Sequence, residues 1–482
     1  MTAREYDLIV IGAGVAGENV ADYATKGGLK VALVEAELVG GECSYWACMP
    51  SKALLRAGSA LRAARAVGGA AQAVTGDVDP AAAFARRTSI VHDWDDTSQA
   101  DWVASADIDL VRGHARFTGE RALTVESSDG SKVDLRAKHA VTISTGSVSL
   151  LPDIPGLAGI EPWTSHEATS ATAAPESLAI LGGGVVACEL ATAYSSFGTK
   201  VTMIVRGETL LTGQEPFAGE AVAEALAEAG VTIRHGVEVE SAHRTESNAV
   251  LDLNDGGKVV AEQVLVATGR APRTMDLGLE TIGLTDGDWL DVDDTLLVTG
   301  FDWLYAVGDV NHRALLTHQG KYQARAAGDV IAARARGDRV HDGMWGRHVA
   351  SADAVAVPQV TFTDPEVASV GLTAEAAARK FAEEGAGRDI RVIDYDLSWL
   401  AGSTVYADGY KGQARAVIDV ERQVVIGATF VGPDVSELLQ AATIAIVGEV
   451  PLSRLWHAVP AYPTVNEVWL RFLEVYGREE SA

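Results

Sequence analysis

Cysteine, basic residues and long apolar runs are all scarce in this sequence. It contains 3 Cys among 482 residues, and Lys and Arg number 39 against 66 Asp and Glu, which gives a net charge of −27. Such a surface repels nucleic-acid phosphates and anionic lipid heads. We find no run of the roughly 18 apolar residues that a membrane span needs, and no signal peptide. We therefore expect no nucleic-acid partner, no membrane partner and a cytoplasmic location, where a disulfide is catalytic rather than structural.

The length is too great for one hydrophobic core. A chain of 482 residues predicts about three domains. Its 48% hydrophobic and 22% charged content is ordinary for a globular protein. Because the net charge is strongly negative, any anionic cofactor has to be held by local features, such as helix N-termini and individual arginines.

A glycine-rich turn follows the first apolar run, residues 6–11, which reads as a buried parallel strand. The glycines of the turn are Gly12, Gly14 and Gly17. A helix is predicted to about residue 26, and a strand at 30–34 leads into Glu35. In such a unit the glycines let a pyrophosphate approach the helix N-terminus, and the acid accepts hydrogen bonds from ribose hydroxyls. The segment therefore predicts a dinucleotide site.

The same unit occurs again near the middle of the chain. A strand at 178–181 leads into Gly182-Gly183-Gly184, with Ala187 in the position of the third fingerprint glycine. A helix to about residue 197 and a strand at 200–205 follow. Two separate dinucleotide sites on one chain indicate electron transfer between two cofactors.

Two of the three cysteines, Cys43 and Cys48, lie just after the first unit. A pair this close can form a small-loop disulfide and reopen, which makes it a two-electron store. Two buried core cysteines are the alternative, whereas zinc is unsupported because the chain has no CxxC and no His near the pair. The third cysteine, Cys188, lies in the second predicted helix and reads as a packed residue.

Later segments complete the pattern. Two strands end in Thr-Gly, at 140–146 and 264–269, and another ends in Gly308-Asp309. After residues 349–358 the sequence alternates β-rich stretches with amphipathic helices, which is typical of an α+β domain. The β-rich stretches are 359–362, 412–419 and 424–431, and the helices are 373–384 and 436–447. Residues 57–83 are Ala-rich and helix-prone.

Together these motifs resemble the class I pyridine nucleotide–disulfide oxidoreductases over essentially the whole chain. The motifs are the first glycine turn, Cys43-x4-Cys48-x-Pro50-Ser51-Lys52, the two Thr-Gly strand ends, the second glycine turn with Glu189, Gly308-Asp309, residues 361–366 and Pro463-Thr464-x-x-Glu467. The resemblance implies an α/β fold with two Rossmann-like dinucleotide-binding domains and a C-terminal α+β dimerisation domain. The implied domains are an FAD domain (1–155 and 270–345), an NAD(P) domain (156–269) and an interface domain (350–482). The implied assembly is a homodimer whose active sites use residues of both subunits.

The resemblance also implies roles for individual residues. Cys48 would be the flavin-side sulfur, and Cys43 the interchange sulfur that meets substrate. Lys52 would lie near the flavin N5, paired with Glu189, and Asp309 would bind the ribityl or phosphate arm of FAD. The other residues expected at the cofactors are Gly12, Gly14, Gly17, Glu35, Gly41, Thr145, Gly146, Gly182, Gly184, Gly269 and His318.

Two features near the expected flavin have more than one interpretation. His318 lies at the start of a helix whose N-terminus the family directs at the pyrimidine edge of the flavin, where it would stabilise negative charge. A packed or solvent-capped helix residue is the alternative. Tyr45 and Trp46, between the two cysteines, read either as packing or as an aromatic wall for a flat acceptor such as a quinone.

The second unit favours NADPH over NADH. An NAD site usually carries an acid where Val205 stands, and that acid is missing. Arg206 follows directly and can bind a 2′-phosphate, as the resemblance to glutathione and mercuric reductases also implies. An exposed surface arginine is the alternative, and Glu208 nearby weakens a phosphate site.

One position departs from the family. Its disulfide reductases carry a histidine, supplied by the partner subunit, that moves protons to and from the interchange thiol. Here Tyr462 takes that position, while the orienting acid, Glu467, remains. A tyrosine is a poor base at neutral pH, because its pKa is near 10. His457 lies five residues upstream, outside the family position. Mercuric reductase also has a tyrosine here, but its C-terminal cysteine pair has no counterpart in this sequence.

The sequence therefore predicts an FAD enzyme, reduced by NADPH, whose Cys43–Cys48 pair passes electrons to a disulfide or another small-molecule acceptor. No metal site is expected. One alternative is a quinone or metal-ion reductase of the same fold, which Tyr462 favours. Another is an NAD-dependent dihydrolipoamide dehydrogenase, against which Val205 and Tyr462 both argue. The last is a redox-sensing flavoprotein without turnover.

Overall fold

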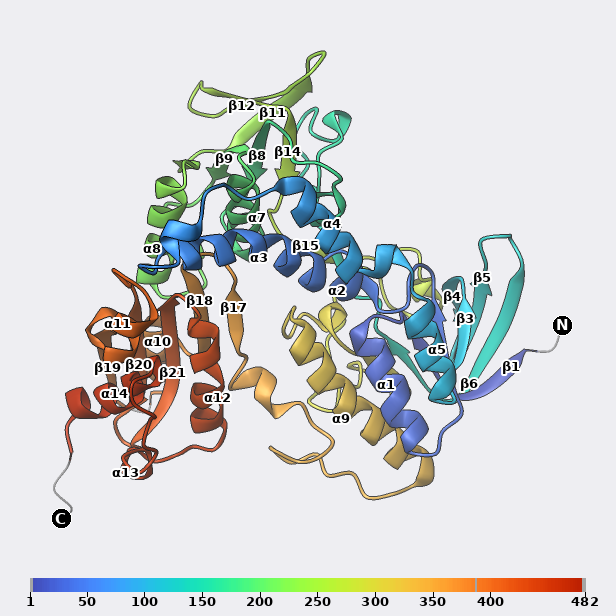
Figure 1. The fold of residues 1–482 in the computed structure, drawn as a ribbon. Helices are drawn as coiled ribbons and strands as arrows, with labels where there is room; N and C mark the ends of the chain where they lie inside the picture. Colours follow the sequence, from blue (N-terminus) through green and yellow to red (C-terminus); the bar gives the residue numbers. More distant parts are fainter. Residues whose placement is uncertain (1–2, 386–387, 479–482) are drawn as a thin grey trace. The chain divides into compact units, whose positions relative to one another are not determined.

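The computed structural model describes residues 3–385 and 388–478 (Figure 1). Its contacts divide the chain into two compact units. The first unit comprises Met1–Pro50, Arg87–Leu150 and Gly269–Ala354, and the second comprises Ser51–Arg86, Leu151–Thr268 and Val355–Ala482. The second unit contains both the segment expected to bind NAD(P) and the segment expected to dimerise, so the three-domain boundaries stay a prediction.

The first unit is built on one seven-stranded sheet, in the order β3-β2-β1-β6-β5-β4, with β16 also paired to β6. Strands β1, β2, β3, β6 and β16 run parallel, and the antiparallel hairpin of β4 and β5 extends the far edge. The strands are β1 (Arg4–Ile11), β2 (Val31–Glu35), β3 (Asp109–Arg112), β4 (His114–Gly119), β5 (Ala122–Glu126), β6 (Lys132–Ile143) and β16 (Leu304–Ala306). The central strands are apolar and buried on both faces, as a parallel sheet requires.

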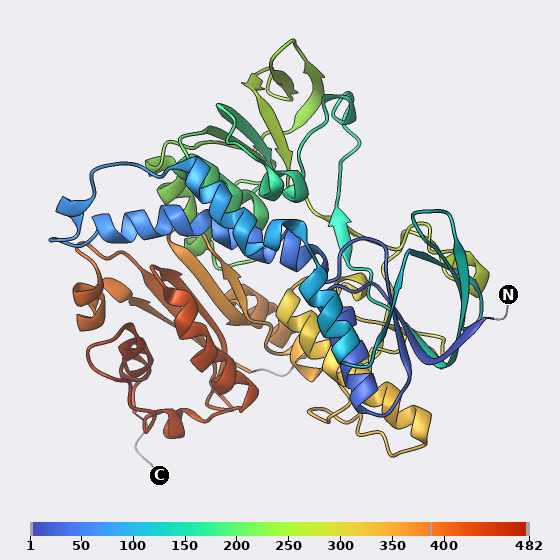
Figure 2. The same cartoon turned by 45° about the vertical axis from the view of Figure 1, so that its right-hand side comes forward.

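Two long helices of the first unit pack side by side, α1 (Val15–Lys26) and α9 (Thr317–Arg336) (Figure 2). Small residues allow the close approach, since a Cβ added to Gly328 would lie 2.6 Å from the Cβ of Tyr23. The other helices of this unit are α2 (Gly41–Tyr45) and α5 (Thr97–Ser105). A two-stranded ribbon of β7 (Ser147–Ser149) and β15 (Arg270–Pro272) completes it.

The second unit contains three sheets. A parallel sheet, β10-β9-β8-β14, carries the second glycine turn, and the antiparallel sheet β11-β12-β13 belongs to the same segment. A five-stranded antiparallel sheet, β17-β18-β21-β20-β19, forms the C-terminal part. The strands are β8 (Ser177–Leu181), β9 (Lys200–Val205), β10 (Thr232–His235), β11 (Val239–Arg244), β12 (Ala249–Leu253), β13 (Lys258–Ala261), β14 (Gln263–Val266), β17 (Gln359–Thr361), β18 (Glu366–Gly371), β19 (Ile390–Asp396), β20 (Gln413–Asp419) and β21 (Val424–Gly432).

Helices of the second unit include α4 (Pro80–Ile90), which runs from the second unit into the first, α6 (Ser165–Ser170), α7 (Val185–Ser196), α8 (Pro216–Glu228), α10 (Ala374–Glu383), α11 (Ala401–Tyr406), α12 (Leu439–Val447), α13 (Leu452–Leu455) and α14 (Val468–Tyr476). Six of them, α6, α7, α8, α10, α12 and α14, pack against these sheets (Figure 1). Helix α3 (Cys48–Arg65) begins at the second cysteine of the pair. Among the described residues, no helix combines the length and apolar character needed to cross a bilayer.

The predicted fold class is confirmed, and the elements of both glycine-turn units lie within one or two residues of the prediction. The helix-prone stretch 57–83 contains the end of α3, at Arg65, and the start of α4, at Pro80. Glycines and a proline separate the two helices there. The predicted helix 436–447 begins as a 3₁₀ turn, Val435–Leu438, before α12.

Candidate active site

The first glycine turn is shaped to admit a phosphate group. A Cβ on Gly12 would lie 2.5 Å from the carbonyl oxygen of Ser144, and a Cβ on Gly17 would lie 1.8 Å from that of Gly12. Gly14 precedes helix α1, and the nearest atom to its would-be Cβ is 3.9 Å away, on Gly41. The turn is thus packed from behind and open at the helix N-terminus. These features fit the pyrophosphate of FAD.

Glu35 ends strand β2 behind this turn. Its Oε2 accepts a hydrogen bond from the backbone N–H of Ala13 (2.6 Å), and its Oε1 accepts one from that of Glu37 (2.7 Å). The side chain is 9% exposed, and burial raises the pKa of this carboxyl. Each carboxylate oxygen has a second lone pair, so Glu35 can brace the turn and still accept from a ribose hydroxyl.

Other predicted residues gather around the same turn. Gly41 has a φ of +59°, and a Cβ there would lie 2.8 Å from the Cα of Gly14, so this position also requires glycine. Thr145 and Gly146 follow β6 beside Gly12, and Thr145 Oγ1 is buried without a hydrogen-bond partner among the described residues. An unpaired buried hydroxyl beside the turn is a donor for a bound cofactor.

Asp309 follows β16 in the first unit. It contacts two residues that the sequence analysis did not predict, Ser147 and Arg270. The Ser147 hydroxyl donates to its Oδ2, and Arg270 donates to the Ser147 hydroxyl (2.6 Å) and to its carbonyl (2.7 Å). Arg270 Nε lies 4.0 Å from Asp309. Arg270 directly follows the Thr-Gly at 268–269, so its position next to a predicted strand end was the available signal. Gly269 itself has a φ of +149°.

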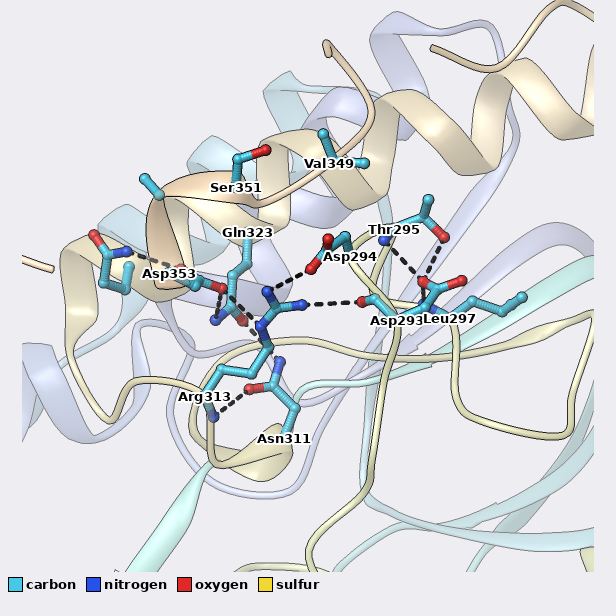
Figure 3. A network of polar contacts seen from close by, with 12 residues as sticks. Asp293, Asp294, Thr295, Leu297, Asn311, Arg313, Gln323, Val349, Ser351 and Asp353 are labelled. Atoms are coloured by element: carbon cyan, nitrogen blue, oxygen red, sulfur yellow. Dashed lines mark hydrogen bonds and ion pairs between the residues drawn. The ribbon is translucent and has the colours of Figure 1, made fainter. Parts of the chain in front are cut away.

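A buried polar network holds the loop that carries Asp309 (Figure 3). Gln323, on α9, accepts through Oε1 from the backbone N–H of Gly308 (2.9 Å) and from Asn311 Nδ2 (2.8 Å). Its amide donates to Asp353 Oδ2 (2.9 Å), which also lies 3.2 Å from Arg313 Nε. Burial raises the pKa of Asp353, while the Arg313 guanidinium lowers it. The network fixes the Gly308-Asp309 loop against α9.

The two redox cysteines lie on neighbouring elements, Cys43 in α2 and Cys48 at the start of α3. A hydrogen bond with Cys48, followed by burial, raises the pKa of the Cys43 thiol. Thr317, the first residue of α9, places its Oγ1 3.1 Å from Cys48 Sγ. His318 is next on α9 and exposed, at the helix start that was expected.

The aromatic residues of the redox loop differ in exposure. Tyr45 is fully buried, with its hydroxyl 3.4 Å from the carbonyl of Asp95, so it packs and cannot line a surface pocket. Trp46 is half-buried, with its ring 5.7 Å from that of Tyr45. Cys188 is also fully buried, as predicted, and burial raises its pKa to about 12.

Lys52 forms an ion pair with the buried carboxylate of Glu189 within the second unit. Lys52 Nζ donates to Glu189 Oε2 (2.7 Å), and the other oxygen accepts from the backbone N–H of Phe362 (2.9 Å). Glu189 is 4% exposed, and the ammonium lies 4.9 Å from the Phe362 ring. One carboxylate therefore joins α3, α7 and the segment that follows β17. The contact to Phe362 was not anticipated.

The second glycine turn is also open at a helix N-terminus. Gly182 has a φ of +128°, and a Cβ on it would lie 2.3 Å from the carbonyl oxygen of Ala267. Gly184 precedes α7 and has open space around its Cβ position. At the end of β9, Val205 is buried, whereas the side chain of Arg206 is 86% exposed, 3.9 Å from Glu238. These features fit a second dinucleotide, with Arg206 available to solvent.

The C-terminal motif combines an exposed ring with a buried acid. Tyr462 is 76% exposed, and His457 is exposed as well. Glu467 is 6% exposed, with Oε1 3.5 Å from Arg471, and its buried Oε2 has no hydrogen-bond partner among the described residues. No cluster of three or more His, Cys, Asp or Glu able to hold a metal occurs in residues 3–385 and 388–478.

Two nucleotide-binding turns and a neighbouring dithiol define a two-cofactor dithiol oxidoreductase. The model of the pyridine nucleotide-disulphide oxidoreductase family matches residues 6–329, and that of its dimerisation domain matches residues 357–471. The chain belongs to this family, and is therefore an FAD- and NAD(P)-binding oxidoreductase with a Cys43–Cys48 redox pair. The dimerisation domain implies a homodimer.

Similar proteins include enzymes with different acceptors. A mercuric reductase of Staphylococcus aureus is 31% identical, and the match covers 96% of this chain and 81% of that protein. A dihydrolipoyl dehydrogenase of Haloferax volcanii is 32% identical, with 97% and 95% covered. The HOCl-induced flavoprotein disulfide reductase RclA of Escherichia coli, solved with Cu(II), has the same fold, with a TM-score of 0.82 and 24% identity over 99% of this chain and 100% of that one.

Proposed function

We propose that this protein is an NADPH-preferring reductase that delivers electrons through its Cys43–Cys48 pair to small acceptors that need no proton relay, with quinones as the first class. The observation that carries the proposal is Tyr462, an exposed tyrosine where the family's disulfide reductases use a histidine. A disulfide substrate leaves as a thiolate and needs a proton, whereas a quinone can be protonated by water after reduction. Tyrosine is a poor acid–base group for the first task at neutral pH.

The residues of the first unit have distinct parts in this function. FAD, when bound, supplies the two-electron exchange between the nicotinamide and the dithiol. Gly12, Gly14 and Gly17 shape the turn for its pyrophosphate, and Glu35 and Asp309 accept from its sugar hydroxyls. Cys48 is the flavin-side sulfur and Cys43 the outer sulfur. The contact of Cys48 with the N-terminus of a long helix supports the first assignment, because that end stabilises an anion.

Residues of the second unit bind the nicotinamide nucleotide. Lys52 and Glu189 form a pre-oriented ion pair, in which the buried carboxylate fixes the position of the ammonium group. Arg206 selects NADPH by binding the 2′-phosphate. The absence of an acid at Val205 and the solvent exposure of the guanidinium support this choice. Glu238 limits the affinity by competing for the same charge.

The homodimer has shared active sites, in which Tyr462 and Glu467 act at the partner's dithiol. The exposed ring of Tyr462 and the unsatisfied buried oxygen of Glu467 support this arrangement, because both groups lack the neighbours that a closed site would give. Glu467 orients the group at position 462. A full-length protein that sediments as an active monomer would exclude the shared site.

Metal-ion reduction is the second candidate. Mercuric reductases of three species are 31% identical to this chain, each over 96% of its length. A soft metal ion binds a thiolate without a proton relay, so the same feature at Tyr462 suits this acceptor too.

The test is steady-state NADPH oxidation by holoenzyme with a benzoquinone, Hg(II), lipoamide and glutathione disulfide as separate acceptors. We expect fast turnover with the quinone and weak turnover with both disulfides. Tyr462→His should raise disulfide reduction about ten- to a hundredfold, while the matched Tyr462→Phe should not. Ordinary enzyme rates with wild-type protein and a small disulfide would overturn the proposal. Fast turnover with Hg(II) alone would favour the second candidate, and no turnover with any acceptor would identify a redox sensor.

A further inference from the structure

One buried amide joins the loop that carries Asp309 to helix α9 (Figure 3). Gln323 is fully buried, and its Oε1 accepts from the backbone N–H of Gly308 (2.9 Å) and from Asn311 Nδ2 (2.8 Å). Its Nε2 donates to Asp353 Oδ2 (2.9 Å). Two donors and one acceptor therefore surround the Gln323 amide, and each meets the atom that suits it.

These surroundings allow the Gln323 amide only one orientation. A backbone N–H can only donate, so the atom that faces Gly308 has to be the side-chain oxygen. The Oδ1 of Asn311 accepts from the backbone N–H of Arg313 (3.0 Å), which turns its Nδ2 towards Gln323. A carboxylate can only accept, so Asp353 binds the nitrogen. Turning the amide over would oppose two donors at Gly308 and two oxygens at Asp353.

The carboxylate that fixes this amide is itself firmly held. The side chain of Asp353 is 1% exposed, and its Oδ2 lies 3.2 Å from Arg313 Nε. Its Oδ1 accepts from Gln319 Nε2 (2.8 Å). Burial raises the pKa of Asp353, while Arg313 and the two glutamine amides oppose this shift. All the neighbours named here are donors, and a protonated carboxyl would direct its O–H at them, so the contacts favour the ionised acid.

The bond to Gly308 holds the backbone immediately before Asp309. Gly308 has a φ of +85° and a ψ of −154°, a conformation that is essentially restricted to glycine. Glycine also populates many other conformations, so an unanchored Gly308 would let the Asp309 side chain change direction. With the anchor in place, Asp309 Oδ2 accepts from the hydroxyl of Ser147. The loop is therefore ordered by the protein alone.

We propose that Gln323 is a positioning residue for FAD, which holds Gly308 so that the Asp309 carboxylate is set before the cofactor binds, and that Asp353 fixes the orientation of the Gln323 amide. A loop that is already ordered raises affinity, because less ordering is required on association. The inference rests on the role proposed above for Asp309.

Helix α9 offers a matched control one turn earlier. Gln319 is also buried and donates to the same carboxylate, but among the described residues it has no hydrogen bond to the loop 308–313. Gln323→Met and Gln319→Met each remove an amide at similar volume, and each leaves Asp353 with one donor fewer. Only Gln323→Met removes the acceptor of the Gly308 N–H.

Two measurements on the full-length protein follow the loop and the cofactor separately. Hydrogen exchange of the peptide that contains Gly308, read by mass spectrometry in protein freed of FAD, reports the loop. Quenching of FAD fluorescence on reconstitution gives the dissociation constant. We expect Gln323→Met to speed the exchange and to raise the dissociation constant about tenfold, the factor that one buried hydrogen bond contributes. Gln319→Met should leave the constant nearly unchanged.

A conservative variant, Gln323→Glu, adds a pH profile. One of its oxygens can still accept from Gly308, but the other faces Asp353, so the two carboxyls need one shared proton to act as the amide and the carboxylate do. Arg313 and, beyond it, Asp294 are the other charged groups at this contact. Relative to wild type at the same pH, we expect near-normal FAD affinity at about pH 5.5 and a loss of about tenfold at about pH 8.5. Gln323→Met should show the same loss at both.

The outcomes that would overturn the proposal are specific. Equal losses of affinity in Gln323→Met and Gln319→Met would show that the network only braces α9. An unchanged dissociation constant in Gln323→Met, or a Gln323→Glu profile parallel to that of wild type, would show that the bond to Gly308 does not serve the cofactor. If Gln323→Met does not fold, the Gln323→Glu profile decides alone.

Asp309→Ala keeps this inference separate from the function proposed above. Full FAD affinity in Asp309→Ala would show that the role proposed for Asp309 is wrong. Lost affinity in Asp309→Ala with none lost in Gln323→Met would overturn the inference about Gln323 alone. Failure of the acceptor screen affects neither result, because both measurements are made without turnover.

Discussion

The two glycine turns of this chain have the same order of elements but different surroundings. Where the first has Gly17, the second has Ala187, fully buried yet accommodated. A Cβ at Gly17 would lie 1.8 Å from the Gly12 carbonyl oxygen, so the first turn has no room for the methyl group that the second carries. The first turn is the more tightly packed of the two.

The residues at the ends of strands β2 and β9 show the same difference in packing. Glu35 is buried and braces its turn through two backbone N–H groups, whereas Arg206 extends into solvent with one carboxylate 3.9 Å away. A site assembled before binding holds its ligand more firmly, because less ordering is required on association. The comparison supports the proposal that the first turn holds the resident cofactor and the second the exchanging nicotinamide nucleotide.

The largest expected effect comes from exchanging the small residues. Gly17→Ala forces the backbone of the first turn apart, so we expect loss of bound FAD and about 3 kcal/mol of stability. The matched change, Ala187→Gly, should cost about 1 kcal/mol, the usual helix penalty for glycine. Flavin absorbance after gel filtration and urea unfolding measure both. Equal effects of the two variants would remove the contrast between the turns.

A second contrast concerns the pH dependence of stability. It involves Glu18, which follows Gly17, and Cys188, which follows Ala187. Glu18, with Oε1 buried and unpaired among the described residues, has its pKa raised by burial to about 7, although Lys321 opposes the shift and Glu35 adds to it. The folded state favours the protonated acid. The protonated Glu18 therefore contributes its full stabilisation below pH 4.5. As pH rises to about 7 this stabilisation is lost, and the free energy of unfolding falls by about 2–3 kcal/mol.

Glu18→Gln should flatten the urea stability between pH 4.5 and 7. Cys188 occupies the corresponding place in α7, and burial raises its pKa to about 12, outside this range. Cys188→Ala should therefore shift stability equally at both pH values. A Glu18→Gln variant as pH-dependent as wild type would show that this carboxyl ionises normally.

The smallest expected effect is the most selective. Arg206→Ala should raise the Michaelis constant for NADPH about ten- to a hundredfold and leave that for NADH almost unchanged, because only NADPH carries the 2′-phosphate. Glu238→Gln is the matched control, and should improve NADPH binding slightly by removing the competing carboxylate. Equal losses for both nucleotides would show that Arg206 does not contact the phosphate.

Local sequence patterns were enough for the two glycine-turn units. Strand Lys200–Val205 and the end of α1 at Lys26 are where the pattern predicts them, because apolar periodicity and glycine spacing are local properties. The Lys52–Glu189 pair, 137 residues apart, was found through the family resemblance alone. Local patterns contain nothing that would connect those two positions.

Contacts between distant segments could not be predicted in the same way. Thr317 and Cys48 are 269 residues apart, and the Ser147–Asp309–Arg270 group joins three segments that only the folded sheet brings together. Tyr45 shows the same limit for burial, because an aromatic residue in a redox loop suits packing and exposure equally. Which of the two holds depends on neighbours elsewhere in the chain.

The assignment of the two sulfurs is tested most directly by the spectra of two single variants. In oxidised Cys43→Ser holoenzyme, Cys48 cannot form the disulfide, and its thiolate should give a long-wavelength charge-transfer band without any reductant. Cys48→Ser should show no such band, either oxidised or after two-electron reduction. If Cys43→Ser remains plain yellow while Cys48→Ser shows the band, the sulfur roles are reversed and the account of the site is contradicted.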